Sequence, residues 1–439
     1  MLLTNYMSFR KIIDNRNVTM LTNLRKSQGN YLMDSNKNKY LDMYGNIGSL
    51  PLGYNHPKLQ DFFKDASKYS HLLIHRPALG VNPPLEWVQE VEKFYKNYCP
   101  SNLDFMFIGC GCGSGANENA FKATFIHYAR KHFSDERLSL MLKSSLKNKE
   151  PGSPNLSIMS FKKGFHGRTL GCLSTTRSNP WHKINIPAFK WPVAPFPEYK
   201  YDVAENEYIN YLEDVRCLQE TEKIIKQNKT IAGMIIEPIQ AEGGDRYASN
   251  YFFRELQNLA HNNNITFIVD EVQTGGGSTG KMWAHEYWNA YSTPDIVTFS
   301  KKMQVAGYFC KNEFKSDSPY QLFNTWMGDP FKIILSNKIY EIIQEENMLQ
   351  KSLNVGEYIM KELKDVQNKT NKISNIRGKG LFIAFDYNSN SIVTLKNELI
   401  KNGINIGTCG TNSIRLRPSL TLDYNDVDYF INKLNKSLK

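Results

Sequence analysis

The chain has 439 residues, 41% of them hydrophobic and 22% charged, which is the composition of a globular protein with a sizeable core. Its formal net charge of +11 comes from 54 basic and 43 acidic residues, yet the basic residues are scattered, so a nucleic-acid surface has no support. No stretch has the long uncharged apolar run of a membrane span. The length suits two large domains, or a large and a small domain with an arm.

The N-terminal residues 1–19 carry Arg10, Lys11 and Arg16 between aliphatic side chains, and Asp14 interrupts them. This segment is either a poor transit peptide or an irregular start. The whole chain has 7 cysteines, an odd number spread along its length, which favours a reducing compartment over a disulfide framework. They are Cys99, Cys110, Cys112, Cys172, Cys217, Cys310 and Cys409.

The first predicted elements lead to a glycine-rich turn. Residues 29–44 read as a short hairpin, and Leu85 to Tyr98 has apolar positions at helical spacing. A strand, Leu103 to Ile108, then runs into Gly109 to Gly115, and a helix is predicted over Asn117 to Phe133. Strand, glycine loop and helix in this order present backbone N–H groups to a phosphate, although no Gly-Lys-Ser/Thr follows, so this is not a P-loop.

Strands and helices alternate through the middle of the chain. Ser157 to Phe161 is strand-like and leads into the loop Gly164 to Thr169. Ile231 to Ile236 is a second strand, which leads into Glu237 to Gly244, and the helix Tyr251 to His261 follows. This alternation predicts right-handed βαβ units and a mostly parallel sheet, and therefore an α/β fold.

An acid and a lysine each follow the end of a buried strand in the next stretch. Residues 265–269 are apolar and β-branched and end at Asp270, and residues 295–300 end at Lys301. Ligands of parallel sheets bind beyond the carboxyl ends of the strands. Pyridoxal phosphate needs a lysine for its Schiff base and a carboxylate for its ring nitrogen. The alternative is that Asp270 only caps a strand and Lys301 is solvated.

The regular alternation of strands and helices ends at Asp329-Pro330. Beyond it the sequence predicts helix over residues 331–367, a strand over 381–387, and helices at 395–401 and from 425. This is typical of a smaller α+β domain. We expect three parts: an N-terminal segment near the small domain over 1–60, a large cofactor-binding α/β domain over 61–330, and a small C-terminal α+β domain over 331–439.

Several motifs in order resemble the class III aminotransferases, which are pyridoxal phosphate enzymes of fold type I, and within them the 4-aminobutyrate aminotransferases of animals. The resemblance covers nearly the whole chain from Gly29 and implies the fold-type-I architecture. Its most specific pieces are Ala194-Pro195-Phe196-Pro197, residues 237–245 (EPIQAEGGD), residues 270–277 (DEVQTGGG), residues 298–303 (TFSKKM) and residues 323–330 (FNTWMGDP).

The resemblance implies a role for each residue around the cofactor. Lys301, rather than its neighbour Lys302, would form the Schiff base and carry the proton. Asp270 would pair with the ring nitrogen. The other implied contacts are Phe165 and Val272 on the ring faces, Gln273 at the ring hydroxyl, Gly113 and Ser114 at the phosphate, and Thr325 at the phosphate of the neighbouring subunit, which implies a homodimer with shared sites.

The resemblance also implies the substrate-binding residues. Arg168 would bind the carboxylate far from the reacting amine, and Arg415 the α-carboxylate of glutamate or 2-oxoglutarate, because guanidinium groups bind carboxylates bidentately. 4-Aminobutyrate has no α-carboxylate, so Glu242 would pair with Arg415 in the first half-reaction and release it in the second. Ile47 and Phe323 would line the substrate pocket. The alternative for Arg168 and Glu242 is ordinary surface pairing.

The chain departs from the animal enzymes at several positions. They carry Cys-x-x-Cys in the glycine loop, which can hold an iron–sulfur cluster, but here Cys112 is followed by Gly115 at the second position, and Cys110 gives Cys-x-Cys instead. One remaining ligand per subunit argues against a cluster, and we expect no metal site. Residues 305–307 (VAG) and Thr408 also differ from the family pattern, which bears on substrate fit and turnover.

The function implied is transfer of the amino group of 4-aminobutyrate, or of relatives such as β-alanine or 3-amino-2-methylpropanoate, to 2-oxoglutarate, giving succinate semialdehyde and glutamate. One alternative is another class III enzyme, of the ornithine type. Another is a cofactor-binding protein without turnover. The resemblance implies the mitochondrial matrix, or otherwise the cytoplasm, and neither a nucleic-acid nor a membrane partner.

Overall fold

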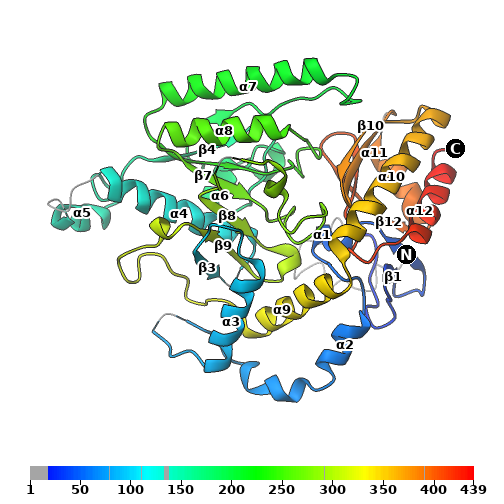
Figure 1. Cartoon of the computed structure of the whole chain (residues 1–439), viewed down its shortest axis with the longest axis horizontal. Coiled ribbons are helices and arrows are strands. Elements are labelled where there is room, and N and C mark those ends of the chain that lie inside the picture. Colours follow the sequence, from blue (N-terminus) through cyan, green and yellow to red (C-terminus); the bar gives the residue numbers. More distant parts are fainter. Residues whose placement is uncertain (1–17, 79, 110, 133–137, 291, 390) are drawn as a thin grey trace.

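A computed structural model describes residues 18–439 except 79, 110, 133–137, 291 and 390. Cys110 and most of the N-terminal segment considered for targeting therefore lie outside the described residues. The centre of the molecule is a seven-stranded sheet in the order β3-β9-β8-β7-β6-β4-β5 (Figure 1). Its strands are β3 (Phe105–Gly109), β4 (Ser157–Phe161), β5 (Val193–Ala194), β6 (Ile231–Ile236), β7 (Thr266–Asp270), β8 (Ile296–Phe299) and β9 (Ala306–Cys310).

The mostly parallel sheet predicted from the alternation of elements is confirmed. From β8 through β7, β6 and β4 to β5 every neighbouring pair is parallel. Strand β9 is antiparallel to both β8 and β3, so β3 again runs in the direction of β8. Every residue of β6, β7, β8 and β9 is buried, which is why these strands read as continuous apolar runs in the sequence.

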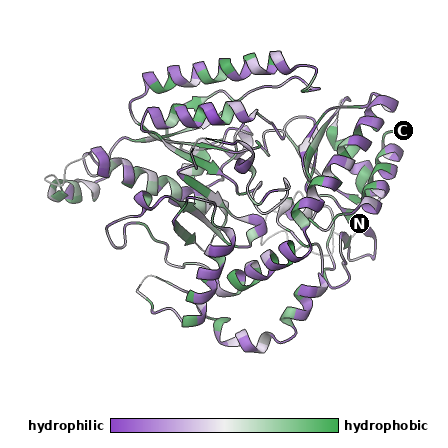
Figure 2. Ribbon diagram, viewed as in Figure 1, coloured by the Kyte–Doolittle hydropathy of each residue, from purple (hydrophilic) through white to green (hydrophobic). Residues whose placement is uncertain are grey.

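Helices cover both faces of this sheet. Helix α4 (Gly113–His132) packs on β9, β8 and β6, and α8 (Asn250–Asn262) packs on β7. Helix α7 (Glu207–Gln227), which the sequence reading passed over, lies on the outer side of α8 (Figure 1). The central strands are hydrophobic, whereas α7 and α8 carry both hydrophobic and hydrophilic residues (Figure 2). The sheet is therefore the middle layer of three.

A second, antiparallel sheet has the order β10-β11-β14-β13. Its strands lie in the C-terminal part of the chain. The sheet packs against α10 (Met348–Thr370), which in turn contacts α12 (Tyr424–Ser437). Helix α11 (Ile392–Lys401) lies against α12. The strands are β10 (Ile373–Lys379), β11 (Phe382–Tyr387), β13 (Gly407–Cys409) and β14 (Ser413–Leu416).

The predicted N-terminal hairpin is confirmed as β1 (Tyr31–Met33) and β2 (Lys39–Asp42), which pair antiparallel. Strand β12 (Ile404–Asn405) adds to β2 in parallel, with Ile404 opposite Leu41. Leu41 and Ile404 are both fully buried. Residues 363 positions apart, Leu41 and Ile404, thus share one small sheet, which brings the loop after β2 close to the C-terminal strands.

The helical region predicted over residues 331–367 consists of two helices in the structure. Helix α9 (Pro330–Glu345) begins at the cap Asp329, whose carboxylate accepts from the N–H of Lys332 at 3.1 Å. Asn347 then takes a left-handed conformation with φ of 48°, which ends the helical path before α10. Asparagine tolerates this conformation better than most residues, so the break is encoded by one side chain.

The remaining helices are short, apart from α3 (Leu85–Tyr98), which has the predicted bounds and packs against α9. No helix in the described ranges is long and apolar enough to cross a membrane. The short helices are α1 (Gly45–Gly48), α2 (Pro57–Phe63), α5 (Leu138–Ser145), α6 (Leu170–Thr175), η3 (Ala66–Leu72), η5 (Pro180–His182), η6 (Ala284–Tyr287), η7 (Lys301–Met303) and η8 (Asn312–Phe314).

Candidate active site

The polar residues predicted to form a site follow the carboxyl ends of parallel strands. Asp270 is the last residue of β7, and Lys301 begins the turn η7 directly after β8. Gly113 begins α4, which follows β3, and β3 runs parallel to β8. The sheet therefore brings all three to one edge. Helix α4 begins at Gly113, earlier than the predicted Asn117, so the end of the glycine loop is the first turn of the helix.

Asp270 is buried and held by three donors. The backbone N–H of Val272 donates to Oδ1 at 3.0 Å, while Asn117 Nδ2 and His166 Nδ1 each donate to Oδ2 at 2.8 Å. A carboxylate has about four acceptor positions, so one remains for a ligand N–H. Asn117 Oδ1 and His166 Nε2 are buried without a hydrogen-bond partner in the described structure. Asp270 is thus fixed in direction and still able to accept from a ring nitrogen.

Lys301 is the lysine that faces this site. Its Nζ donates to the carbonyl of Ile47 at 3.1 Å. Burial, followed by the positive charges of Arg415 and Arg417, lowers the pKa of Lys301 to about 8, while Asp270 and Glu242 act in the opposite direction. Because all four charged groups act on the Lys301 amine, they lie around the same site as this lysine. The backbone of Lys301 is left-handed, with φ of 47°, and stores strain at this position.

The neighbouring Lys302 points elsewhere. It is 3% exposed, and its Nζ donates to the carbonyl oxygens of Gln273 at 3.0 Å and Gly275 at 3.5 Å. Burial and the charge of Lys301 lower the pKa of Lys302 to about 7. Lys302 therefore holds the turn after Asp270 in place and has no access to the edge of the sheet.

Gly113 allows the glycine turn to approach Val272. A Cβ at Gly113 would lie 2.5 Å from Val272 Cγ1, which is shorter than any real contact. The carbonyl of Cys112 accepts the first helical bond, from Ala116 at 3.2 Å, so the free N–H groups of α4 begin at Gly113 and Ser114. These N–H groups can bind an anion such as a phosphate. The turn and Val272 together form a narrow cradle.

The backbone of Phe165 is held in place by the buried side chain of Glu237. Its backbone N–H donates to Glu237 Oε1 at 2.8 Å, and that of Ala241 donates to Glu237 Oε2 at 3.1 Å. Burial and the nearby Asp270 charge raise the pKa of Glu237 well above its usual range. Glu237 joins the loops after β4 and β6. Arg168 follows Phe165, and its guanidinium carbon lies 4.8 Å from the centre of the Phe165 ring.

Arg415 and Glu242 form a direct ion pair. Arg415 is 4% exposed, and its Nη1 donates to Glu242 Oε2 at 3.0 Å. Its Nη2 donates to the hydroxyl of Tyr44 at 3.3 Å, and its Nε is buried without a partner in the described structure. The Glu242 side chain keeps 29% of its exposure, so it can turn towards solvent and leave Arg415 to another carboxylate.

Gln273 contacts a second buried arginine. Arg417 Nε donates to Gln273 Oε1 at 2.9 Å, and its Nη2 donates to Asp245 Oδ1. The Arg417 guanidinium also lies 3.3 Å from the centre of the Phe382 ring. Gln273 is therefore oriented by the C-terminal part of the chain, and Arg417 adds positive charge beside Lys301.

Thr325 lies on a segment that opens to the surface. With Trp326 and the glycine loop at Gly111 and Gly115 it lines a cavity of about 270 Å³. Phe323, two residues earlier, is half-buried, and the side chain of Ile47 is 43% exposed. Ile47 thus contacts Lys301 through its backbone carbonyl oxygen, and Thr325 lies beside the glycine loop of its own chain.

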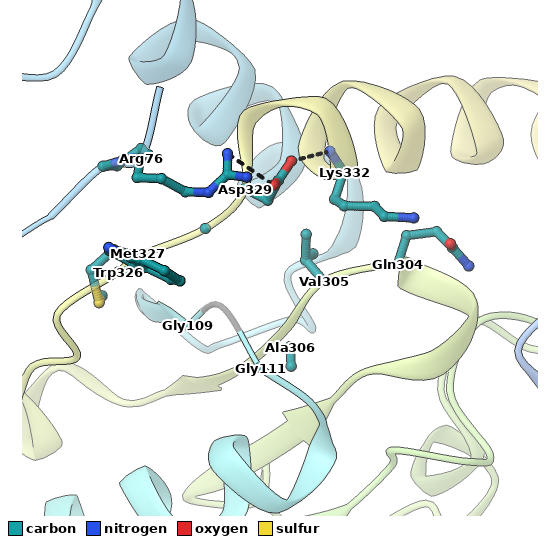
Figure 3. Close-up of a pocket in the computed structure, with 12 residues that line it drawn as sticks. Arg76, Gly109, Gly111, Gln304, Val305, Ala306, Trp326, Met327, Asp329 and Lys332 are labelled. Atoms are coloured by element: carbon teal, nitrogen blue, oxygen red, sulfur yellow. Dashed lines mark hydrogen bonds and ion pairs between the residues drawn. The ribbon is translucent and has the colours of Figure 1, made fainter. Parts of the chain in front are cut away.

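An adjoining cavity of about 260 Å³ lies between the glycine loop and the start of α9. Arg76 and Asp329 point toward each other on one side of it, and Gly109 and Gly111 lie across from them (Figure 3). Arg76 Nη1 is 3.5 Å from Asp329 Oδ2. Because this cavity is open, the polar groups along it are accessible from outside the chain.

No group of three metal-ligating side chains lies close enough together to hold an ion in the part of the chain that the structure describes. The Cys112 thiol is exposed, and Gly115 lies in the first turn of α4.

The sequence reading missed three residues of the site. Asn117 lies one helical turn after Gly113, a spacing that could have placed it against Asp270. Tyr44 reaches Arg415 and Arg417 reaches Gln273 only because β12 joins β2 and β14 lies in the second sheet. No local signal reports such long-range contacts.

Comparisons with known proteins agree with this geometry. The family model described as "Aminotransferase class-III" matches residues 12–438. The 4-aminobutyrate aminotransferase of Dictyostelium discoideum is 43% identical over 440 residues, which are 98% of this chain and 87% of that protein. The mitochondrial 4-aminobutyrate aminotransferase of Sus scrofa is 43% identical over 425 residues, 94% of this chain and 84% of that protein. The solved lysine aminotransferase of M. tuberculosis has a TM-score of 0.87 and 26% identity, covering 98% of this chain and 97% of that one.

Proposed function

This chain belongs to the class-III aminotransferases, and on that premise we propose that it moves the amino group of 4-aminobutyrate to 2-oxoglutarate, giving succinate semialdehyde and glutamate. Relatives 43% identical over nearly the whole chain are 4-aminobutyrate aminotransferases, which supports this substrate. The observation that carries the proposal is the Arg415–Glu242 pair, because it lets one site accept amines with and without an α-carboxylate.

The cofactor of this proposal is pyridoxal 5'-phosphate, and the residues present fit it. The cradle at Gly113 excludes a side chain and offers N–H groups to the phosphate, with Ser114 beside it. Asp270 has a free acceptor position for the ring nitrogen, and Lys301 offers the amine. Val272 and Phe165 would contact the ring faces, and Gln273 the ring hydroxyl. Departing from the animal pattern at Gly115, this chain would hold no iron–sulfur cluster.

Bound pyridoxal phosphate supplies an aromatic ring that accepts the electrons left when a proton leaves the carbon beside the amine. The chain supplies the rest. Three donors hold the Asp270 carboxylate in place, so that it could accept from the ring nitrogen. Lys301 Nζ, with a pKa of about 8, is neutral in an appreciable fraction of molecules near neutral pH, so it can take and return that proton.

Two arginines sort the substrates. Arg168 would bind the carboxylate distant from the amine of 4-aminobutyrate, while Glu242 occupies Arg415. When glutamate or 2-oxoglutarate enters, its α-carboxylate would replace Glu242 at Arg415, since a guanidinium binds either carboxylate in the same way. Ile47 and Phe323 would line the apolar part of the substrate. β-Alanine and 3-amino-2-methylpropanoate carry the same two groups and would be further substrates.

A homodimer with shared sites is part of this proposal. The segment before Arg76 exposes apolar side chains, with Ile74 92% and Leu73 53% exposed. It runs beside Trp326, because the N–H of Met327 donates to the carbonyl of Pro77 at 2.7 Å. Large exposed apolar patches mark contact surfaces. A second copy on this surface would place each Thr325 near the phosphate of the other subunit.

We propose the division into an N-terminal segment (1–60), a large domain (61–330) and a small domain (331–439), because the strands of the seven-stranded sheet all lie within 61–330 and those of the four-stranded sheet within 331–439, while β12 joins the N-terminal hairpin to the small domain. We also propose the mitochondrial matrix, since the relatives from Sus scrofa and Homo sapiens are mitochondrial enzymes.

The test is a substrate comparison with the purified, cofactor-loaded protein. We expect succinate semialdehyde to form from 4-aminobutyrate and 2-oxoglutarate, with kcat/KM at least about tenfold above that for ornithine or lysine, since a tenfold ratio corresponds to about 1.4 kcal/mol. Lys301→Ala should form no product and keep its circular dichroism spectrum. A clear preference for ornithine would overturn the substrate assignment, and turnover by Lys301→Ala would overturn the lysine assignment.

A further inference from the structure

A one-turn helix carries a histidine into the neighbourhood of Arg168. This turn, η5, has Pro180 at its first position, and the side chain of Asn179 caps it by accepting from the N–H of Trp181 at 3.0 Å. Lys183 anchors it to α6, because its Nζ donates to the carbonyl oxygens of Leu173 and Thr176. The position of His182 at the end of this turn is therefore set by local capping and by a separate helix.

His182 accepts a hydrogen bond from the predicted substrate arginine. Arg168 Nη2 lies 3.1 Å from His182 Nε2. An arginine N–H can only donate, so His182 Nε2 must offer its lone pair. The imidazole is then neutral and carries its proton on Nδ1, which is buried without a partner in the described structure. The contact fixes both the tautomer and the charge of His182.

The same imidazole packs on Phe165. The two ring centres lie 5.5 Å apart at an angle of 73°, an edge-to-face arrangement. Arg168 lies over the Phe165 ring at 4.8 Å, so Phe165, His182 and Arg168 contact one another pairwise. Among the described residues, no carboxylate forms an ion pair with Arg168. Its guanidinium is therefore oriented by two neutral rings and keeps N–H groups for a ligand.

We propose that His182 is a positioning residue that orients the Arg168 guanidinium for the carboxylate of the ω-amino acid and does so only in its neutral form. This inference rests on the proposed function, in which Arg168 binds that carboxylate. A long, exposed arginine loses rotational freedom when it binds, and a partner that orders it beforehand lowers this cost. His182 thus tunes affinity for the substrate carboxylate and takes no part in proton transfer.

The charges around His182 favour the neutral form. Two charged groups act on it from other elements: Arg168, which is positive, and Glu242, whose negative charge acts in the opposite sense. Burial, followed by the charge of Arg168, lowers the pKa of His182 below its usual range. Protonation at lower pH would remove the acceptor and put a second positive charge against Arg168, so binding of the carboxylate should weaken as pH falls.

The experiment compares the holoenzyme with His182→Leu and His182→Gln. Leucine removes the acceptor, while glutamine keeps an oxygen that can accept and does not titrate. We expect His182→Leu to raise KM for 4-aminobutyrate about tenfold with kcat changed less than about twofold, which is the loss of about 1.4 kcal/mol of carboxylate binding. His182→Gln should recover most of that affinity. Trp181→Leu, a change on the same turn at a side chain 79% exposed, is the matched control and should behave as wild type.

A second readout avoids turnover. Calorimetric titration with butanoate, which has the carboxylate and lacks the amine, should show wild-type affinity falling as the pH drops below about 6.5, because the pKa of His182 lies below that usual histidine value. His182→Gln should lose that pH dependence. Unchanged KM and butanoate affinity in His182→Leu, or the same pH dependence in His182→Gln, would overturn the inference. Failure of wild type to convert 4-aminobutyrate would instead overturn the proposed function.

Discussion

Two adjacent lysines meet opposite surroundings at the end of β8. Lys301 Nζ reaches the edge of the sheet and interacts electrostatically with Asp270 and Glu242. Lys302 Nζ instead donates to the carbonyl oxygens of the turn after Asp270. A sequence offers both as candidates, and only the direction in which each side chain leaves the backbone separates them. Lys301 also has a left-handed backbone conformation, with φ of 47°.

The pKa of about 8 for Lys301 predicts unusual reactivity in the cofactor-free protein. The pKa is lowered, so the amine becomes neutral as pH rises through about 8, well below the usual lysine value of about 10.4. We expect brief acetylation of Lys301 to increase with pH with a midpoint near 8. Peptide mass spectrometry measures this site by site. A midpoint equal to that of exposed lysines would contradict the assigned surroundings.

Removing the Glu242 side chain should slow the half-reaction with 4-aminobutyrate much more than the half-reaction with glutamate. Glu242→Ala leaves the buried Arg415 charge without its partner, which is costly, so we expect single-turnover rates with 4-aminobutyrate to fall by about tenfold. Glutamate brings its own α-carboxylate, and its rate should change by less than about twofold. Glu198→Ala, which removes the exposed partner of Arg246, is the control. Equal losses with both amines would count against the exchange of carboxylates at Arg415.

At the scale of elements, the sequence predicted what depends on local pattern. Strands β4 and β6 have the predicted bounds because each is an apolar run closed by turn residues. The break between α9 and α10 was missed, since apolar spacing continues across Asn347 and only its backbone conformation ends the helix. The contact of Tyr44 with Arg415 depends on sheet pairing between distant segments, and nothing near either residue predicts it.

The glycine turn at the start of α4 offers a matched pair of substitutions. Gly113→Ala would put a Cβ against Val272, and overpacking of this kind typically costs about 1–3 kcal/mol. We therefore expect the affinity of the cofactor-free protein for pyridoxal phosphate, measured by titration, to fall at least about tenfold. A Cβ at Gly115 would have nothing within 4 Å, so Gly115→Ala should bind normally. Equal affinities of the two variants would show that the cradle does not bind the cofactor.

At the scale of the whole molecule, assembly should depend on the apolar segment beside Trp326. Ile74→Asp puts a charge on a side chain that is 92% exposed in the single chain, and we expect sedimentation to shift from dimer towards monomer with loss of transamination. Leu146→Asp changes a side chain that is 89% exposed next to α5, away from the site, and is the control. A dimeric, active Ile74→Asp variant would place the interface elsewhere.

The one antiparallel strand inserted between β3 and β8 has a consequence for the shape of any bound cofactor. Neighbouring strands lie about 4.8 Å apart, so the corner that starts α4 and the corner that carries Lys301 are separated by about 10 Å across the sheet. The flexible four-carbon side chain of Lys301 reaches across part of this gap, so a cofactor can carry its phosphate arm and its reactive carbon on neighbouring ring atoms and still contact both corners.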